Sequence, residues 1–195
     1  MDLEAAPRRR RGKELEAALL DAAWAELAEH GYAAFTYDGV ARRAGTSRPV
    51  LYRRWPTKPD LLKATIRHYA DQQSIDPRDT GSLRGDVIWL LSQMSVERAG
   101  MMTLIMTNLG GYFEETGETF ADIRAHLKQG RASVMTEVVE RAVARGEIDP
   151  ARLTDRIVHL PFDLIRNELM MTLRPVPRKT VEEIVDTIFL PLVRP

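Results

Sequence analysis

The sequence predicts an all-α protein of about nine helices, and three observations support that fold class. Apolar residues recur at the helical spacing of i, i+3, i+4 and i+7 in most of the chain, and no segment shows the sustained polar–apolar alternation of a strand. The 195 residues are 44% hydrophobic and 29% charged. This apolar content is sufficient for a folded core and excludes a chain that is disordered throughout.

The first helix is expected from Lys13 to His30, and Gly31 follows it as a residue suited to the left-handed turn that ends a helix. Its apolar stripe consists of Leu20, Ala23, Trp24 and Leu27. One face of this helix is therefore expected to be buried.

Capping residues predict three further short helices. Thr36, Ser47 and Thr57 are residue types that cap helix N-termini, whereas Gly45 and Pro56 stop a helix. The expected helices span 36–44, 48–55 and 57–72.

The clearest linker is the polar stretch from Ser74 to Ser82, which contains Pro77 and Gly81. Beyond it, helices are expected at 83–97, 100–109, 119–145, 153–173 and 179–193. The predicted organisation is a flexible basic N-terminal arm (1–12), a first helical domain (13–73) and a larger second one (74–195).

Several classes of protein are excluded by composition. The chain has no cysteine, so it has neither disulfides nor thiolate metal sites. The longest apolar run, Val87–Leu91, is far shorter than the ~18 residues that a membrane span requires. The basic run Arg8–Arg11 is not followed by the apolar segment of a secretory signal. We expect a cytoplasmic protein with no membrane segment.

The charges are unevenly distributed although the formal net charge is zero. Residues 1–68 carry a net +4 and residues 69–195 a net −4. Within the first part, 38–58 holds six cations and one anion. Such a segment is either a site for a polyanion or a solvated helix face.

The spacing of Ala41, Gly45 and Leu51 favours the polyanion interpretation. Two helices that cross at a steep angle need a small residue at the contact, a permissive residue in the turn and an apolar anchor on the second helix. These three residues meet those needs, and Val40 and Ala44 complete the inward face. The sequence therefore predicts a helix-turn-helix.

The outward face of the second helix has the residue types that read duplex DNA. With Leu51 pointing into the core, Pro49 and Arg53 project outward. Arginine pairs bidentately with guanine in the major groove, and apolar side chains contact the thymine methyl. Arg48 and Arg53 suit the first role, and Pro49 and Val50 the second.

Phosphate contacts are expected around this face. Lys58 stands at the start of the next helix, where the unpaired N–H groups favour an anion. The expected DNA-contacting residues are Tyr37, Thr46, Ser47, Arg48, Pro49, Val50, Tyr52, Arg53, Arg54 and Lys58. For Arg42 and Arg43 a solvated surface is equally plausible, and the arm Arg8–Lys13 is either a disordered tail or a contact to phosphates or the minor groove.

The stretch LLDAAWAELAEHGYAAFTYDGVARRAGTSRPVLYRRWPTKPDLL, Leu19 to Leu62, resembles the DNA-binding domain of the TetR family of bacterial transcriptional regulators. The matching positions are Gly31-Tyr32, Ala41, Ala44-Gly45, Ser47, Leu51-Tyr52, Lys58 and Leu61. Thr46, Pro49, Trp55 and Pro59 depart from the family pattern. None of these departures removes an expected DNA contact, but they leave the operator sequence open.

A dimer is expected because one helix-turn-helix makes few base contacts, and two copies about 34 Å apart are normally needed for specific binding. Apolar stripes on the last two helices suit either intrachain core or an interface, and the resemblance implies that these helices form a four-helix dimer interface. The expected interface residues are Ile157, Leu160, Leu164, Val181, Ile184, Val185, Ile188 and Leu192.

The central helices are rich in methionine and aromatic residues, which suit either ordinary core or a pocket for an apolar ligand. The resemblance implies a cavity there for a small apolar effector that shifts the spacing of the two DNA-reading heads. The candidate ligand-binding residues are Trp89, Met94, Met102, Met106, Tyr112, Phe113, Phe120 and Phe162.

An enzyme is the competing class, but the four histidines are scattered singly, and no catalytic or metal-binding motif is present. His126 and His159 are either structural or lining the pocket. A helical carrier of lipophilic molecules that does not bind DNA is the remaining alternative, although such a carrier has no need of Arg48, Arg53 and Lys58. We therefore predict a ligand-responsive DNA-binding regulator, most simply a repressor that binds a palindromic operator as a homodimer, without a cofactor or metal.

Overall fold

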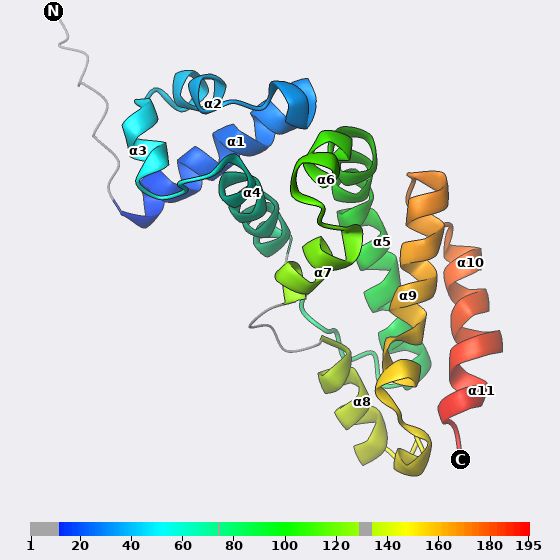
Figure 1. Cartoon of the computed structure of the whole chain (residues 1–195). Helices are drawn as coiled ribbons and strands as arrows, with labels where there is room; N and C mark the ends of the chain where they lie inside the picture. The colour runs from blue at the N-terminus through cyan, green and yellow to red at the C-terminus, as the bar shows by residue number, and fades with distance from the viewer. Residues whose placement is uncertain (1–11, 74, 129–133) are drawn as a thin grey trace, which may run out of the picture. The chain divides into compact units, whose positions relative to one another are not determined.

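The computed structural model describes residues 12–73, 75–128 and 134–195, and its regular structure over these ranges is helical, with no strand (Figure 1). The expected all-α fold class is confirmed. The chain forms two compact units. The first unit contains the described residues up to Gln72 together with Asn108–Leu127, and the second contains Gln73–Thr107 and the described residues from Lys128 to Pro195. The N-terminal arm predicted for 1–12, including Arg8–Arg11, lies outside the described residues except for Gly12.

The first unit begins with α1 (Lys13–Ala34), which is bent where the first helix was predicted to end. Gly31 has φ 69° and ψ 173°, a conformation open to glycine and strained for other residues. The chain then makes one more helical turn before Phe35. Of the predicted apolar stripe, Leu20, Ala23 and Leu27 are buried and Trp24 is partly exposed, so this face of α1 lies largely in the core of the unit.

Three helices follow, and each begins where its capping residue predicts: α2 (Tyr37–Ala44), α3 (Arg48–Tyr52) and α4 (Lys58–Gln72). The predicted end of α3 at residue 55 is wrong, because the chain leaves the helix after Tyr52. Both α2 and α4 make extensive contacts with α1. The first unit also contains α6 (Gly110–Thr116), which was not predicted, and α7 (Phe120–Lys128). Packing of α6 against α1 explains how a seven-residue helix with no capping side chain is held.

The second unit is built around α5 (Leu83–Asn108), a single helix of 26 residues where two helices were predicted. The predicted break lay between Glu97 and Gly100, and it is wrong. A mid-helix glycine costs only ~1 kcal/mol, and the residues on either side of Gly100, Ala99 and Met101, are both buried. Their burial outweighs the cost of the glycine.

The remaining helices of the second unit are α8 (Val134–Ala144), a short turn at Pro150–Arg152, α9 (Asp155–Thr172) and α10 (Arg178–Glu183). The helix predicted at 119–145 corresponds to α7 and α8, and 129–133 between them lie outside the described residues. From α10 the chain continues through a π-helical stretch, Ile184–Phe189, into α11 (Leu190–Val193). The wider turns lie next to Pro191, which lacks the N–H of an α-helical bond and crowds the preceding turn.

Among the described residues no helix has the length and apolar character needed to cross a lipid bilayer.

Candidate nucleic-acid interface

The helix-turn-helix is defined by local hydrogen bonds at both ends of α2. The Thr36 hydroxyl accepts a bond from the Gly39 amide at 3.1 Å, which caps the N-terminus of the helix. At the C-terminus, Gly45 is left-handed with φ 65°, and the Thr46 amide donates to the Ala41 carbonyl at 2.9 Å. The predicted cap and turn are therefore both present.

The short helix α3 is anchored by one side chain. Leu51 is fully buried, as is Val40 on α2, and Ala41 is 5% exposed. Ser47 occupies the N-cap position, but its hydroxyl does not accept a capping hydrogen bond. With five residues and no capping side chain, α3 depends on the burial of Leu51 for its position.

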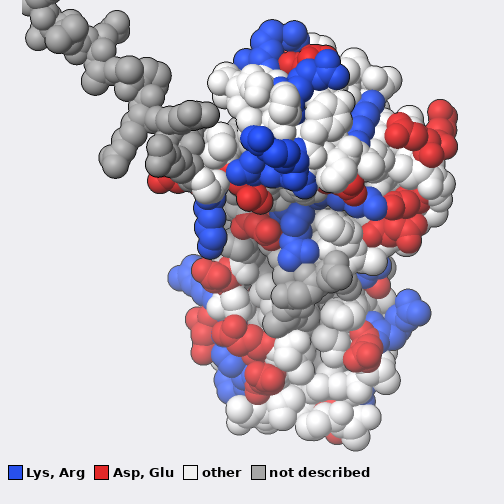
Figure 2. Space-filling view, turned by 60° about the vertical axis from the view of Figure 1, so that its left-hand side comes forward, with Lys and Arg blue, Asp and Glu red and all other residues white. Residues whose placement is uncertain are grey.

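Most of the predicted DNA-contacting residues lie on the accessible side of this motif. Ser47, Arg48, Pro49, Tyr52, Arg53 and Arg54 are exposed, and Thr46, Val50 and Lys58 are partly exposed. Lys and Arg side chains gather over the upper part of the molecule in Figure 2, with acidic side chains among them. The exposed side of α3 thus presents the donors and apolar groups that the sequence predicted for reading DNA.

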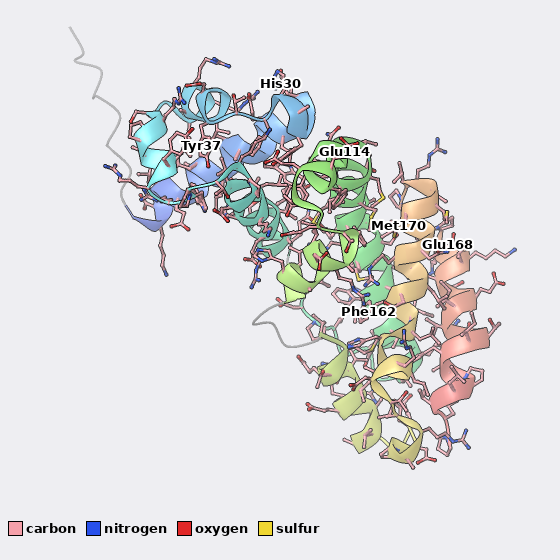
Figure 3. The ribbon with its side chains drawn as sticks, in the orientation of Figure 1. His30, Tyr37, Glu114, Phe162, Glu168 and Met170 are labelled. Atoms are coloured by element: carbon pink, nitrogen blue, oxygen red, sulfur yellow. The ribbon has the colours of Figure 1, made fainter. Side chains whose placement is uncertain are left out.

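Tyr37 departs from the expected role of a surface contact (Figure 3). It is buried, and its hydroxyl donates to the backbone carbonyl of Trp55 at 2.8 Å. Burial raises the pKa of Tyr37 to about 12. Because its hydroxyl is already bonded within the unit, we assign Tyr37 to the packing beneath α3 and not to a phosphate.

Arg48 is held from two directions at the start of α3. Its Nε atom lies 3.2 Å from Oδ1 of Asp38 on α2, and its guanidinium carbon lies 5.8 Å from the ring centre of Tyr52. The Tyr52 ring stacks on Tyr37 with 4.0 Å between ring centres. Hydrogen bonding to Tyr52 and then the charge of Asp38 raise the pKa of Arg48.

Lys58 lies at the N-terminus of α4, where Thr57 and Asp60 form a reciprocal cap: the Thr57 amide donates to the Asp60 carboxylate, and the Asp60 amide donates to the Thr57 hydroxyl, both at 3.2 Å. The Lys58 ammonium lies 4.0 Å from the ring centre of Tyr32, a cation–π contact. Partial burial lowers the pKa of Lys58. The Lys58 ammonium thus lies against the Tyr32 ring at the N-terminus of α4.

Arg43 has a structural role that the sequence left open. Its guanidinium pairs with Glu26 at 3.2 Å and with Glu29 at 2.5 Å, which joins α2 to α1. Glu26 is only 5% exposed, and a Cβ on Gly39 would lie 1.8 Å from its Oε1 atom. A side chain at position 39 would therefore force the buried Glu26 carboxylate to move. Arg42 is exposed, as a solvated residue or a phosphate contact requires.

The candidate ligand-binding residues do not all belong to one unit. Trp89, Met94, Met102, Met106 and Phe162 are in the second unit, and Tyr112, Phe113 and Phe120 are in the first. Tyr112 is fully buried, lies edge-on to Tyr32 and donates its hydroxyl to Glu118 at 2.5 Å. We therefore assign Tyr112 to the core of the first unit, while the other seven remain predictions.

The expected dimer residues divide into two groups by exposure. Val181, Ile184 and Val185 are buried within the chain, so their side chains belong to the core of the second unit and not to an interface. Ile188 and Leu192 are 38% and 40% exposed, and Ile157, Leu160 and Leu164 are partly exposed. On α9, Met170 and Met171 are also exposed, at 37% and 77%, with Met170 labelled in Figure 3.

Family models match both parts of the chain. Residues 77–188 match the tetracyclin repressor-like C-terminal domain, and residues 19–65 match the bacterial regulatory proteins of the tetR family. The chain belongs to the TetR family. It is accordingly a DNA-binding transcriptional regulator and not an enzyme.

Members of the TetR family resemble this chain in sequence and in fold. A protein of Mycobacteroides abscessus named "DNA-binding transcriptional repressor TetR" is 30% identical, over 95% of this chain and 97% of the relative. A TetR-family regulator of Streptomyces coelicolor has a similar structure, with a TM-score of 0.64, 20% identity, and coverage of 94% of this chain and 82% of that one. The regulator FadR of Bacillus subtilis, solved in complex with stearoyl-CoA, has a TM-score of 0.58 at 16% identity, covering 91% and 97% of the two chains.

Sequence reasoning missed three acidic residues near the interface: Asp38, Glu26 and Glu115. The Tyr32 hydroxyl donates to Glu115 at 3.0 Å, beneath the Lys58 ammonium. Asp38 had a signal in the sequence, because it is the one acid among the six cations of 38–58. The partners of Glu26 and Glu115 are distant in sequence, and only the packing of the first unit brings them together.

Proposed function

We propose that this TetR-family regulator is a repressor that binds a palindromic operator as a homodimer and is released when a small apolar molecule binds. The observation that carries the DNA-binding part is the exposed face of α3, where Arg48, Pro49 and Arg53 project beside the buried anchor Leu51. An α-helix with this composition fits the major groove and has the donors that guanine requires.

The homodimer is supported by the size of the reading face and by exposed apolar side chains. A five-residue recognition helix contacts few base pairs, so specificity requires a second copy one helical turn away. Ile188 and Leu192 project from the last helical segment, and a large apolar side chain in contact with water costs free energy that a partner surface recovers. A C2 dimer built on this segment predicts an inverted repeat in the operator.

The effector part is supported by composition and by relatives. The second unit contributes Met94, Met102 and Met106 on α5, and methionine adapts to irregular apolar ligands. The structural neighbour FadR is solved with stearoyl-CoA. For the effector to release the operator, it must bind more tightly to the conformation that cannot span the two half-sites.

Selection of bound duplexes from a random DNA pool tests the proposal. The purified full chain is incubated with the pool at fixed salt, and the retained sequences are determined over several rounds. An inverted repeat with half-site centres about 10 base pairs apart, or a multiple of that spacing, is expected. The proposal would be contradicted if no sequence were enriched and the chain did not bind duplex DNA even at low salt.

A further inference from the structure

Asp38 is an exposed acid beside Arg48, on the proposed DNA-reading side of the motif. Its side chain is 61% exposed, and it stands in the first turn of α2, where the helix dipole favours a negative charge. Near a phosphate backbone, however, a carboxylate opposes binding. A carboxylate at this place therefore needs a role that offsets its repulsion of DNA.

The contact that Asp38 makes is with the guanidinium of Arg48. The Oδ1 atom lies 3.2 Å from Nε, so the ion pair crosses the turn between α2 and α3. The guanidinium carbon also lies 5.8 Å from the centre of the Tyr52 ring. That ring stacks on Tyr37, whose hydroxyl is bonded to the Trp55 carbonyl. Arg48 thus contacts both a carboxylate and an aromatic stack.

Such restraint matters for a base-reading arginine. A free arginine side chain carries ~2 kcal/mol of rotamer entropy, part of which is lost when it binds. Guanine O6 and N7 accept two parallel N–H bonds in a fixed geometry, and an arginine has five N–H donors. When Asp38 engages the guanidinium at Nε, donors at the terminal nitrogens are available for the base, and the plane of the group is already set.

We propose that Asp38 is a positioning residue that sets the base specificity of Arg48. This inference rests on the proposed DNA-reading role of α3 and deepens it. Asp38 does not itself bind a base; it orders the arginine that does. Its negative charge also weakens binding to any duplex through repulsion of the phosphates.

The test compares binding of the full chain to its selected duplex and to the three duplexes substituted at each base pair of one half-site. Four proteins are needed: wild type, Asp38→Asn, Arg48→Ala and the double variant. Arg48→Ala is expected to reduce discrimination at one base pair by roughly 5- to 150-fold. Asp38→Asn is expected to reduce it at the same base pair by roughly two- to tenfold, with unchanged or slightly tighter binding to random duplex. The double variant is expected to discriminate no less than Arg48→Ala alone.

Glu29→Gln is the matched control. Glu29 is an equally exposed acid of the same unit, with a side chain 59% exposed, and it pairs with Arg43. Glu29→Gln changes the net charge by the same amount as Asp38→Asn. It is therefore expected to affect binding to all duplexes alike without altering base discrimination. Thermal unfolding of each variant verifies that the fold is intact.

Three results would overturn the inference. The first is full base discrimination by Asp38→Asn, and the second is a loss of discrimination by that variant at a base pair other than the one assigned to Arg48. The third is an equal loss of discrimination by Glu29→Gln. If the wild-type chain selects no duplex at all, the proposed function fails, whereas selection of a duplex followed by any of these three results refutes the role of Asp38 alone.

Discussion

The two units of the protein use different means to define their helices. In the first unit, short helices begin and end at single polar or glycine residues, such as Thr36 and Gly45 around α2. In the second, α5 runs for 26 residues through Gly100, and α9 contains Pro161. Short helices are marginal on their own: α2 relies on local caps, whereas α3 and α6 in the same unit have no capping side chain and rely on packing. Long helices gain their stability from buried apolar faces, which override single unfavourable residues.

An exposed ion pair of the first unit and a buried one of the second can also be compared. In the first unit, Arg48 and Asp38 pair where both side chains are more than half exposed. In the second, Asp86 is fully buried, accepts bonds from the Thr80 amide and hydroxyl at 2.6 and 2.7 Å, and pairs with Arg145 at 3.1 Å. Exposed charges are available to a partner, whereas the buried pair holds residue 80, at the end of the linker, against the start of α5. The comparison suggests that substitutions in the two units have separable effects.

The largest effect on operator binding is expected from a substitution in the second unit, at the proposed dimer interface. Ile188→Asp places a charge on an exposed apolar position and should produce monomers, with a loss of operator affinity of about a thousandfold because one half-site is no longer bound. Sedimentation and mobility shifts measure the two effects. Ile184 is unsuitable for this test because it is buried in the chain.

Val96→Asp is the control for this prediction. Val96 is 61% exposed on α5 of the same unit, so its replacement changes the same charge and apolar area away from the proposed interface. It should remain dimeric. If Ile188→Asp is also dimeric and binds normally, the dimer is formed by a different surface.

The next prediction compares the truncation of one buried leucine in each unit. Leu51 and Leu91 are both fully buried, and replacement of either by alanine should cost ~3 to 5 kcal/mol of the free energy of unfolding. Only Leu51→Ala should abolish operator binding by the molecules that remain folded, because α3 has no other anchor. Chemical denaturation measures the loss of stability. Titration of operator DNA with protein, under conditions in which each variant is folded, measures the loss of binding. Equal loss of binding in both variants would show that the units are not separable.

A smaller effect concerns the buried carboxylate. Burial on its own raises the pKa of Asp86, but the bonds from Thr80 and the charge of Arg145 outweigh it and leave the pKa below its ordinary value. The contribution of Asp86 to stability is therefore complete above the unfolded pKa of ~3.9 and is lost as the pH falls through the lower folded value. Asp86→Asn should cost ~2 kcal/mol at pH 7 and should make stability less dependent on pH below about pH 4.

Asp186→Asn is the control for Asp86→Asn. Asp186 also pairs with an arginine, Arg84 at 2.7 Å, and its pKa is likewise lowered, but its side chain is 38% exposed. Solvent screens an exposed pair, so this variant should change stability little. Unfolding at a series of pH values gives the measurement. An equal cost for both variants would mean that burial does not determine the strength of these ion pairs.

The smallest effect is on the salt dependence of binding. Lys58→Ala should weaken binding to all duplexes alike and reduce the slope of log affinity against log salt by about one per protomer. Lys63→Ala is the matched control, because the Lys63 ammonium is already paired with Glu118 in the same unit. Binding measured between low and moderate salt distinguishes them. A change of sequence preference in Lys58→Ala would contradict its assignment to phosphate.

The sequence predicted features that depend on neighbouring residues more completely than those that depend on tertiary packing. Helix boundaries at Thr36, Gly45 and Thr57 are confirmed because each depends on residues within four positions of it. The continuity of α5 and the existence of α6 were not predicted, since both depend on burial against distant segments. For the candidate site, the exposed face of α3 was predicted from Leu51, but the burial of Tyr37 and the pairing of Arg48 with Asp38 were not.

What the sequence determined by itself is the family, the all-helical fold and the exposed face of α3, because caps, glycines and apolar spacing act over one or two helical turns. What only the tertiary structure decided is which apolar residues of the last helices are core and which are exposed, and which acid restrains which arginine. Periodicity shows that Val185 and Ile188 lie near one face, but only packing buries the first and leaves the second in contact with solvent. The physical reason is that burial is a property of all neighbours in space, and those neighbours come from segments far apart in the chain.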